Sequence, residues 1–276
     1  NSNMKILITG ANGFLGSVLF NQMQKTNHKI FPLVRKSKGV NDIECDIGNT
    51  RSLLTILNKY RPNVIVNCAA KVDFSERSIQ DQYNVNALAP AVIASWCMDN
   101  KAYLIQISSS IVNGNTLVKS GVNSMELPIN YYGVTKLLAD RAIRVSQCEH
   151  AIIRFGGIYG EDGPNHLGIN SVITQAKLGN IPTIIGTGKG VRNYTHVQDA
   201  AKLIVYCIDN NIMGTHYSGS HQSISIAQMI SDICSIYLDN SKPKYKDGLE
   251  SIDQITEVSS ILPKTKLFKE ALQDYR

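Results

Sequence analysis

No stretch of the sequence is long and apolar enough for a membrane-spanning helix, which needs about 18 or more apolar residues in a row. No secretory signal pattern is evident at its start either, so we expect a cytoplasmic protein with no membrane partner. Hydrophobic residues still make up 43% of the 276 positions, which is enough for a globular chain to bury a core.

Cysteine is sparse and scattered: the chain has six, and no two of them form a CxxC pair. Zinc sites and small disulfide frameworks usually need closely spaced cysteines. We therefore expect no metal site, and thiols that are mostly buried in a reducing compartment. The six are Cys45, Cys68, Cys97, Cys148, Cys207 and Cys234.

The net charge is also small, at +6, and the sequence has no long basic run. A nucleic-acid-binding surface usually needs a concentrated basic patch, so we expect no nucleic-acid partner. An anionic small molecule accounts for the positive sign equally well.

Three glycines, by contrast, follow an apolar run at the start, in "MKILITGANGFLG". Residues 5–9 predict a buried strand, and the apolar repeat from Phe14 to Met23 predicts a helix. Glycines in this strand-to-helix turn allow a tight bend and the close approach of a pyrophosphate to the free N–H groups of the helix. A glycine-rich turn without a ligand is the alternative. The predicted dinucleotide-binding residues here are Gly10, Asn12, Gly13, Phe14, Leu15 and Gly16.

Apolar runs and helical repeats alternate through the first half of the chain, which is typical of an α/β fold with a doubly wound parallel sheet. Such a sheet binds ligands at the carboxyl ends of its strands. Pro90 is expected to kink one helix. We expect strands at 5–9, 29–34, 63–67, 102–107 and 151–155, and helices at 14–23, 50–60, 81–98 and 131–146.

The alternation loosens after Phe155, where glycine and proline crowd the segment. We expect a dinucleotide-binding domain over 4–155, with parts of 193–238 returning to it. A smaller substrate-binding lobe is expected over 156–192 and 239–276. In the returning part, helices are expected at 196–209 and 225–238, and a late strand at 215–218.

The string "NYYGVTKLLAD" places Tyr132 and Lys136 four residues apart on an expected helix, so the two share one face. A free tyrosine has a pKa of about 10. A neighbouring ammonium stabilises the phenolate, so we expect Lys136 to lower the pKa of Tyr132 toward the range of general acid–base catalysis. The same lysine can hold the ribose of a nicotinamide cofactor. A surface Tyr–Lys pair without chemistry is the alternative.

The string "LIQISSSIVNG" places serine hydroxyls at the carboxyl end of the expected fourth strand. In this architecture that end faces the ligand crevice, where a hydroxyl can bond a substrate carbonyl. A serine-rich turn without a ligand is the alternative.

Five ordered landmarks resemble the extended short-chain dehydrogenase/reductases that act on nucleotide sugars as epimerases, dehydratases or reductases. They are TGANGFLG, VIVNCAA, ISSS, YYGVTK and GTGKGVRNYTHVQDAA, and they span roughly Met4 to Ser220. The resemblance implies a Rossmann-type doubly wound parallel sheet with a smaller C-terminal substrate-binding lobe. It also implies a nucleotide-sugar substrate and a homodimer.

The resemblance further implies roles for individual residues. The catalytic set is Ser109, Tyr132 and Lys136, which move a proton while a hydride moves to or from nicotinamide. Asn113 departs from the family's usual tyrosine, and residues 155–157 depart from its proline-containing pattern. The implied cofactor contacts also include Asp46, Ile47, Cys68, Ala69, Ala70 and Asn86, and the implied substrate contacts are Ser110 and, on a phosphate, Arg192.

The end of the expected second strand, "PLVRKSK", bears on the choice of cofactor. NAD sites of this type place an acid there, which bonds the ribose 2′-hydroxyl. Here Arg35 stands at that position, with Lys36 and Lys38 beside it. A 2′-phosphate is attracted by these charges, so NADP(H) is favoured over NAD(H). A solvated basic turn is the alternative.

The type of reaction stays open within the family. Family dehydratases place acids directly after the catalytic hydroxyl, but Ser110 and Ile111 stand there, which disfavours dehydration. The strings "YRPNVIVNCAA" and "NVNALAPAVIASWC" resemble the dTDP-4-dehydrorhamnose reductase branch, and "GTGKGVRNYTHVQDAA" resembles the epimerase branch. We expect reduction of a 4-keto group by NADPH, with Tyr132 as proton donor. An NAD-dependent 4-epimerase and a non-catalytic NADP-binding sensor are the alternatives.

Overall fold

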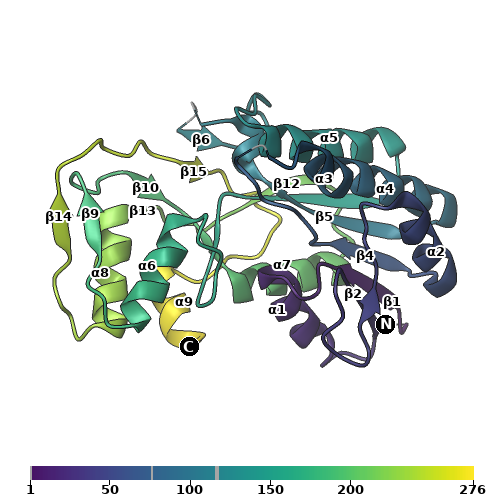
Figure 1. Cartoon of the computed structure of the whole chain (residues 1–276), viewed down its shortest axis with the longest axis horizontal. Helices are drawn as coiled ribbons and strands as arrows, with labels where there is room; N and C mark the ends of the chain where they lie inside the picture. Colours follow the sequence, from purple (N-terminus) through teal and green to yellow (C-terminus); the bar gives the residue numbers. More distant parts are fainter. Residues whose placement is uncertain (1, 76, 116–117) are drawn as a thin grey trace. The chain divides into compact units, whose positions relative to one another are not determined.

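The computed structural model describes residues 2–75, 77–115 and 118–276, which form two compact units. Unit 1 comprises Asn1–Gly114, Met125–Arg154 and Ala201–His216. Unit 2 comprises Asn115–Ser124, Phe155–Ala200 and Tyr217–Arg276. Figure 1 labels the elements of both units. In the part of the chain that is described, no helix is long and apolar enough to cross a membrane.

A seven-stranded sheet forms the centre of unit 1, in the order β12-β7-β5-β4-β1-β2-β3. The pairs β2–β3, β1–β2, β1–β4 and β4–β5 are parallel, as predicted. The sequence did not predict β3, which is too short to show a pattern. The strands are β1 (Lys5–Thr9), β2 (Lys29–Val34), β3 (Ile43–Glu44), β4 (Val64–Asn67), β5 (Tyr103–Ser109), β7 (His150–Phe155) and β12 (Gly214–Ser218).

The order of the strands reverses between β1 and β4. The chain passes outward from β1 to β2 and β3, then returns to the other side of β1 to form β4 and β5. Thr9 and Asn67, the last residues of β1 and β4, are partners in register. Ligands of doubly wound sheets bind outside the carboxyl ends of the strands at such a reversal. The fold therefore directs the search for a site to the residues after β1 and β4.

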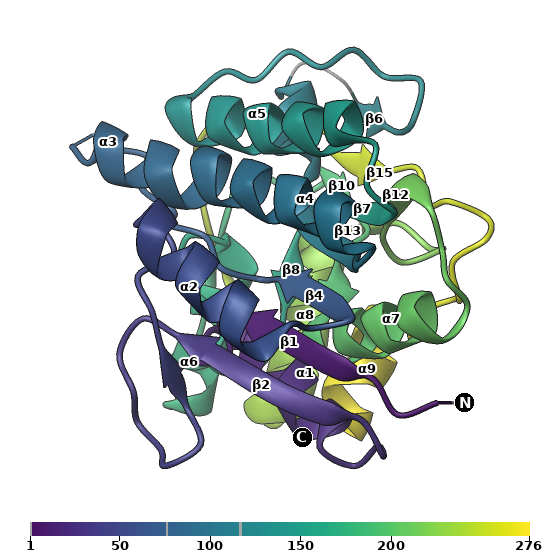
Figure 2. The ribbon, with the colours of Figure 1, turned by 90° about the vertical axis from the view of Figure 1, so that its right-hand side faces the viewer.

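Helices α2, α4 and α5 cover one face of this sheet, and α1 lies on the other (Figure 2). The covered face packs Leu7, Ile65 and Leu104 of the strands against apolar side chains of α2, α4 and α5, among them Leu53 and Ile93. The helices of unit 1 are α1 (Phe14–Met23), α2 (Thr50–Tyr60), α3 (Ile79–Gln82), α4 (Ala89–Asn100) and α5 (Tyr131–Ser146), and α7 (Val197–Asp209) begins in unit 2 and ends in unit 1.

A wide helical turn stands where the sequence predicts a kink at Pro90. The π-helical segment η1 (Tyr83–Leu88) joins α3 to α4, and Pro90 lies in the first turn of α4. Proline has no N–H group to donate to the preceding turn. π-Helical turns are rare and mostly occur as single turns within α-helices, as η1 does here.

Unit 2 has its own apolar core, which includes Tyr159, Ile173, Ile230 and Phe268. The sequence did not predict α6 or α9, because one begins in a glycine-rich segment and the other is only seven residues long. The helices are α6 (Gly168–Lys177), α8 (Ile226–Tyr237) and α9 (Phe268–Asp274). The strands pair as β8 (Ile158–Tyr159) with β11 (Thr195–His196), β9 (Thr183–Ile185) with β14 (Lys244–Lys246), β10 (Val191–Arg192) with β13 (Ile224–Ser225), and β6 (Lys119–Ser120) with β15 (Ile255–Thr256).

Candidate active site

The glycine turn between β1 and α1 is too tight for larger residues. Gly10 has a φ of +61°, and a Cβ added there would lie 2.8 Å from the backbone nitrogen of Ala69. A Cβ on Gly16 would lie 2.0 Å from the carbonyl oxygen of Gly10. The Gly13 N–H donates to that same carbonyl at 2.9 Å, which closes the turn. The glycines thus let α1 start directly against the carboxyl ends of β1 and β4.

The start of α1 leaves its backbone N–H groups to a ligand. Gly13 at the N-cap has no side chain to accept from them, and the first turn has no acidic residue. In α2, α5 and α8, by contrast, Asn49, Asn130 and Ser225 cap the first turn. An uncapped, positively polarised helix end suits a pyrophosphate. The residues present therefore fit the phosphates of a dinucleotide.

Replacing Gly16 with alanine is expected to lower the free energy of unfolding by about 1–3 kcal/mol, because the added methyl group overlaps the Gly10 carbonyl. It should also weaken dinucleotide binding. Gly168→Ala is the matched control, because a Cβ on Gly168 meets nothing within 4 Å. Urea unfolding measures both variants. Equal stability of the two would show that the turn opens without cost.

Polar side chains that the sequence analysis did not single out fix the strand ends. The Thr9 hydroxyl donates to Asn67 Oδ1 at 2.5 Å and accepts from the Ala69 N–H at 3.1 Å. The Asn67 side-chain amide donates to Gln106 Oε1 at 2.8 Å. All three side chains are buried. Their hydrogen bonds connect the side chains of β1, β4 and β5 with one another. The sequence signal that could have predicted these three residues was a polar side chain within each otherwise apolar strand.

Asn86, a predicted cofactor contact, is fully buried and holds the backbone. Its amide accepts from the Lys71 N–H and donates to the Lys71 carbonyl, both at 2.8 Å. It also donates to the Thr135 hydroxyl at 3.2 Å. Asn86 thereby fixes the segment after β4 against α5. A direct contact with a cofactor stays a prediction.

The other predicted cofactor residues lie around the same strand ends. Arg35 is exposed directly after β2, and Asn12 is exposed and donates to the Lys36 carbonyl at 3.3 Å. Asp46 is exposed and accepts from the Gly48 N–H at 3.0 Å. Burial raises the pKa of the Cys68 thiol to about 12. Leu15 and Ile47 are buried, Phe14, Cys68 and Ala69 are half-buried, and Ala70 is exposed.

Ser109, Tyr132 and Lys136 all belong to unit 1, at β5 and the first turns of α5. Ser109 ends β5, and its hydroxyl accepts from the Ile111 N–H at 3.1 Å. Lys136 is buried, and its ammonium donates to the carbonyl of Ile107 in β5 at 2.8 Å. The lysine therefore ties α5 to the strand two residues before Ser109. The Tyr132 ring packs edge-on against Phe74, with 5.6 Å between the ring centroids.

The prediction for the pKa of Tyr132 is wrong. The sequence predicts that Lys136 lowers the pKa of Tyr132, but burial and then the charge of Asp140 raise it to about 12. Burial lowers the pKa of Lys136, and Asp140 opposes that effect. The expectation failed because it ignored the cost of burying a phenolate. Tyr132 is consequently protonated at neutral pH, which is the form that a proton donor needs.

The predicted substrate residues fall in different units. Ser110 begins the short helix η2 (Ser110–Asn113) in unit 1. Arg192 lies in unit 2, where its Nη1 donates to the carbonyls of Val191 at 2.9 Å and Ile252 at 2.7 Å. Asn113, which replaces the family's usual tyrosine, is buried and donates to the Met125 carbonyl at 2.9 Å. Substrate contacts of Ser110 and Arg192 stay predictions.

Within residues 2–75, 77–115 and 118–276, the cysteine and acidic side chains form no second candidate centre. The six cysteines are free, and all but Cys68 are buried. Among the described residues, no three His, Cys, Asp or Glu side chains gather in a way that could hold a metal ion.

Two curated proteins resemble most of the chain in sequence. The probable low-salt glycan biosynthesis reductase Agl14 of Haloferax volcanii is 24% identical over 84% of this chain and 80% of its own length. Methionine adenosyltransferase 2 subunit beta of Bos taurus is 27% identical over 80% of this chain and 68% of its own length.

Solved structures share the fold over nearly the whole chain. The dTDP-4-dehydrorhamnose reductase of Bacillus anthracis, in complex with NADP, has a TM-score of 0.82 and 22% identity, with 99% of both chains covered. The UDP-glucuronic acid 4-epimerase of Bacillus cereus, in complex with NAD, has a TM-score of 0.81 and 24% identity, with 99% of this chain and 98% of that chain covered. These neighbours confirm the predicted Rossmann-type fold.

The family model described as the RmlD substrate binding domain matches residues 4–247. This match covers most of the chain and confirms the resemblance to the extended short-chain dehydrogenase/reductases. The chain belongs to the RmlD substrate binding domain family.

Proposed function

We propose that this protein is an NAD(P)-dependent reductase that acts on a keto group of a nucleotide-activated sugar. The observation that carries the proposal is the placement of Ser109 at the end of β5 and of Tyr132 and Lys136 on the helix tied to that strand. Relatives that are named as glycan-biosynthesis and dTDP-4-dehydrorhamnose reductases support the substrate class.

A nicotinamide dinucleotide fits the turn between β1 and α1. The uncapped first turn of α1 would take its pyrophosphate, and the residues after β4 would lie along its adenosine. When bound, the cofactor supplies the hydride. Lys136 would hold its ribose, because the ammonium has donors left besides the bond to Ile107.

Residues of the protein supply the proton that the keto oxygen needs. As the hydride is transferred to the keto carbon, the keto oxygen gains negative charge. Tyr132 gives its phenolic proton to that oxygen, and the Ser109 hydroxyl donates a hydrogen bond to it. Burial, and then the charge of Asp140, raise the pKa of Tyr132 and so keep its proton in place until the keto oxygen gains charge.

NADP(H) is the preferred cofactor in this proposal, because Arg35 is exposed where a 2′-phosphate would lie. The charge-assisted contact should contribute about 1.5–3 kcal/mol of binding free energy. Arg35→Asp is expected to abolish the preference for NADPH over NADH in calorimetric titrations. Arg51→Ala, on the neighbouring helix α2, should leave it unchanged. Tighter binding of NADH by the wild type would contradict the assignment and favour the epimerase.

The substrate is proposed to be a 4-keto sugar on a nucleoside diphosphate, with Ser110 near the sugar and a phosphate bound by Arg192. The Arg192 guanidinium has five N–H donors, so its bonds to two carbonyls and to the Tyr194 side chain leave others for a ligand. Family resemblance further suggests a cytoplasmic homodimer.

One assay separates this proposal from its alternatives. The purified protein is mixed with NADPH and dTDP-4-dehydrorhamnose, and both NADPH absorbance and the sugar product are followed. Stoichiometric NADPH oxidation supports the reductase. A 4-epimerase would interconvert nucleotide sugars such as UDP-glucuronic acid with no net change in cofactor. Cofactor binding without turnover of either type would favour the non-catalytic NADP-binding sensor.

A further inference from the structure

A buried carboxylate lies one helical turn beyond Lys136. Asp140 is 0% exposed, and its Oδ2 accepts from the Ser108 hydroxyl at 2.7 Å and from Arg154 Nε at 3.0 Å. Its other oxygen, Oδ1, is buried and has no hydrogen-bond partner among the described residues. A buried carboxylate oxygen without a partner is costly, so this side chain needs an explanation beyond packing.

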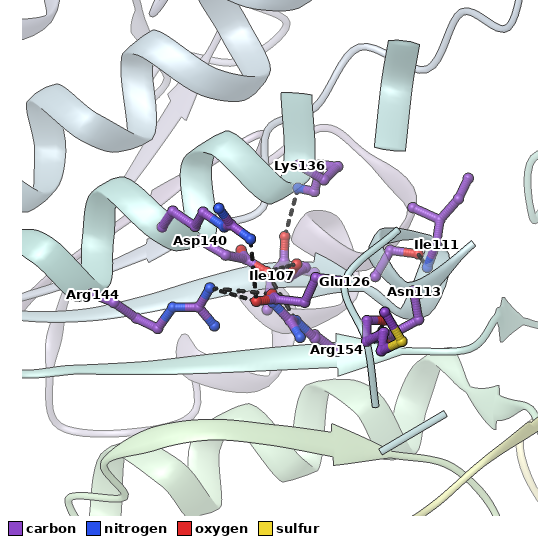
Figure 3. Close-up of polar contacts among 12 residues, drawn as sticks. Ile107, Ile111, Asn113, Glu126, Lys136, Asp140, Arg144 and Arg154 are labelled. Carbon is purple, nitrogen blue, oxygen red and sulfur yellow. Dashed lines mark hydrogen bonds and ion pairs between the residues drawn. The ribbon is translucent and has the colours of Figure 1, made fainter. Parts of the chain in front are cut away.

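The surrounding charges form a network of ion pairs from Asp140 through Arg154 and Glu126 to Arg144, whose side chain is about a third exposed (Figure 3). Arg154 on β7 binds Asp140 with Nε and Glu126 with Nη2, the latter at 2.5 Å. Arg144 also binds Glu126, at 3.1 Å. Arg141, mostly exposed, approaches Glu126 only to 4.0 Å. The two carboxylates and the two close guanidinium groups balance one another.

Lys136 adds one more positive charge to this buried region, and it is only 3% exposed. Residues four apart on a helix lie on the same face, so Asp140 is the carboxylate nearest to it along α5. The titratable groups that act on Lys136 are Asp140 on its own helix and the Cys68 thiol after β4. Burial raises the pKa of Asp140, while Arg154 from β7, the Ser108 hydroxyl and Lys136 oppose that effect, and Asp140 in turn raises the pKa of Tyr132.

We propose that Asp140 is a positioning residue for Lys136: its carboxylate, fixed by Ser108 and Arg154, keeps the Lys136 ammonium charged and bonded to the Ile107 carbonyl. The negative charge of Asp140 also disfavours ionisation of Tyr132. The Tyr132 hydroxyl and the Lys136 ammonium therefore keep their protons until a keto oxygen accepts the proton of the tyrosine. The consequence for catalysis rests on the proposed function. The electrostatic link between Asp140 and Lys136 does not.

The link can be measured without substrate or cofactor. NMR titration of isotope-labelled lysine side chains follows Lys136, whose signal is assigned by its absence in Lys136→Arg. In Asp140→Asn the titration midpoint of Lys136 should move down by about one pH unit or more. Asp140→Glu should restore a midpoint near that of the wild type. Glu126→Gln, which neutralises the other carboxylate bound by Arg154, should leave the titration midpoint of Lys136 unchanged.

Two results would overturn the inference: an unchanged midpoint in Asp140→Asn, or an equal downward shift in Glu126→Gln. If Asp140→Asn does not fold, the double variant Asp140→Asn/Arg154→Met removes the whole ion pair, a change that proteins often tolerate. The Lys136 midpoint should fall there too, and a midpoint like that of the wild type counts against the proposal.

Activity provides a separate readout. In the reductase assay, the alkaline limb of the pH profile should move to lower pH in Asp140→Asn and return in Asp140→Glu. If the wild type reduces no keto sugar while the NMR shift is found, the proposed function fails and the positioning role stands. If reduction is found but neither the midpoint nor the pH profile changes, the positioning role fails alone.

Discussion

Replacing Tyr132 with phenylalanine is expected to lower kcat by about 10²- to 10⁴-fold, the usual contribution of a general acid. The substitution removes only the hydroxyl group. The ring can still pack against Phe74, and Asn130 still caps α5 through the Gly133 N–H. Folding and cofactor binding should therefore survive. Single-turnover oxidation of NADPH in the presence of a 4-keto nucleotide sugar measures the effect.

Tyr131→Phe provides the matched control, because Tyr131 is the adjacent tyrosine on the same helix. Its rate should stay near that of the wild type, and near-UV circular dichroism should show native packing in both variants. A Tyr132→Phe rate within about threefold of the wild type is too small a loss for a general acid. In that case the proton would have to come from another group.

Replacing Arg154 with methionine is expected to lower the free energy of unfolding by about 3–5 kcal/mol, because it leaves a buried carboxylate without its counter-ion. Arg154 is buried and is the guanidinium that joins Asp140 to Glu126. Methionine fills much of the same space, so lost packing contributes little. Chemical denaturation monitored by circular dichroism gives the value.

Arg144→Met is the control that separates the effect of burial from the effect of losing an ion pair with Glu126. Arg144 binds the same Glu126, but about a third of its side chain is exposed. Its loss should cost no more than about 1 kcal/mol, as is usual for exposed pairs. Similar losses for the two arginines would mean that burial of the Asp140–Arg154 pair adds nothing to its effect on stability.

The sequence predicted the parallel sheet and most of its covering helices, because their periodicity is local. The helices at 50–60 and 131–146 match α2 and α5. Short elements such as β3 and α9 escaped, since two or seven residues show too little pattern. The roles of Ser109, Tyr132 and Lys136 came from motifs and stay predictions, although the structure places all three in one unit.

The glycine turn also illustrates what a local pattern can predict. Gly10, Gly13 and Gly16 stand between a strand and a helix, and only that short segment is needed to expect a tight turn. That Gly10 meets the backbone of Ala69 is a different kind of fact. It depends on β4 lying beside β1, which pairs residues far apart in the chain.

The sequence by itself determined the family, the alternation of strands and helices, and the order of the motifs along the chain. Only the tertiary structure decided which charges meet. Ser108, Asp140 and Arg154 come from β5, α5 and β7, and no spacing rule connects them. Nor did the sequence indicate that burial would raise the pKa of Tyr132 rather than Lys136 lowering it. Both outcomes depend on how far packing removes water from a charge, and packing is set by contacts between distant segments.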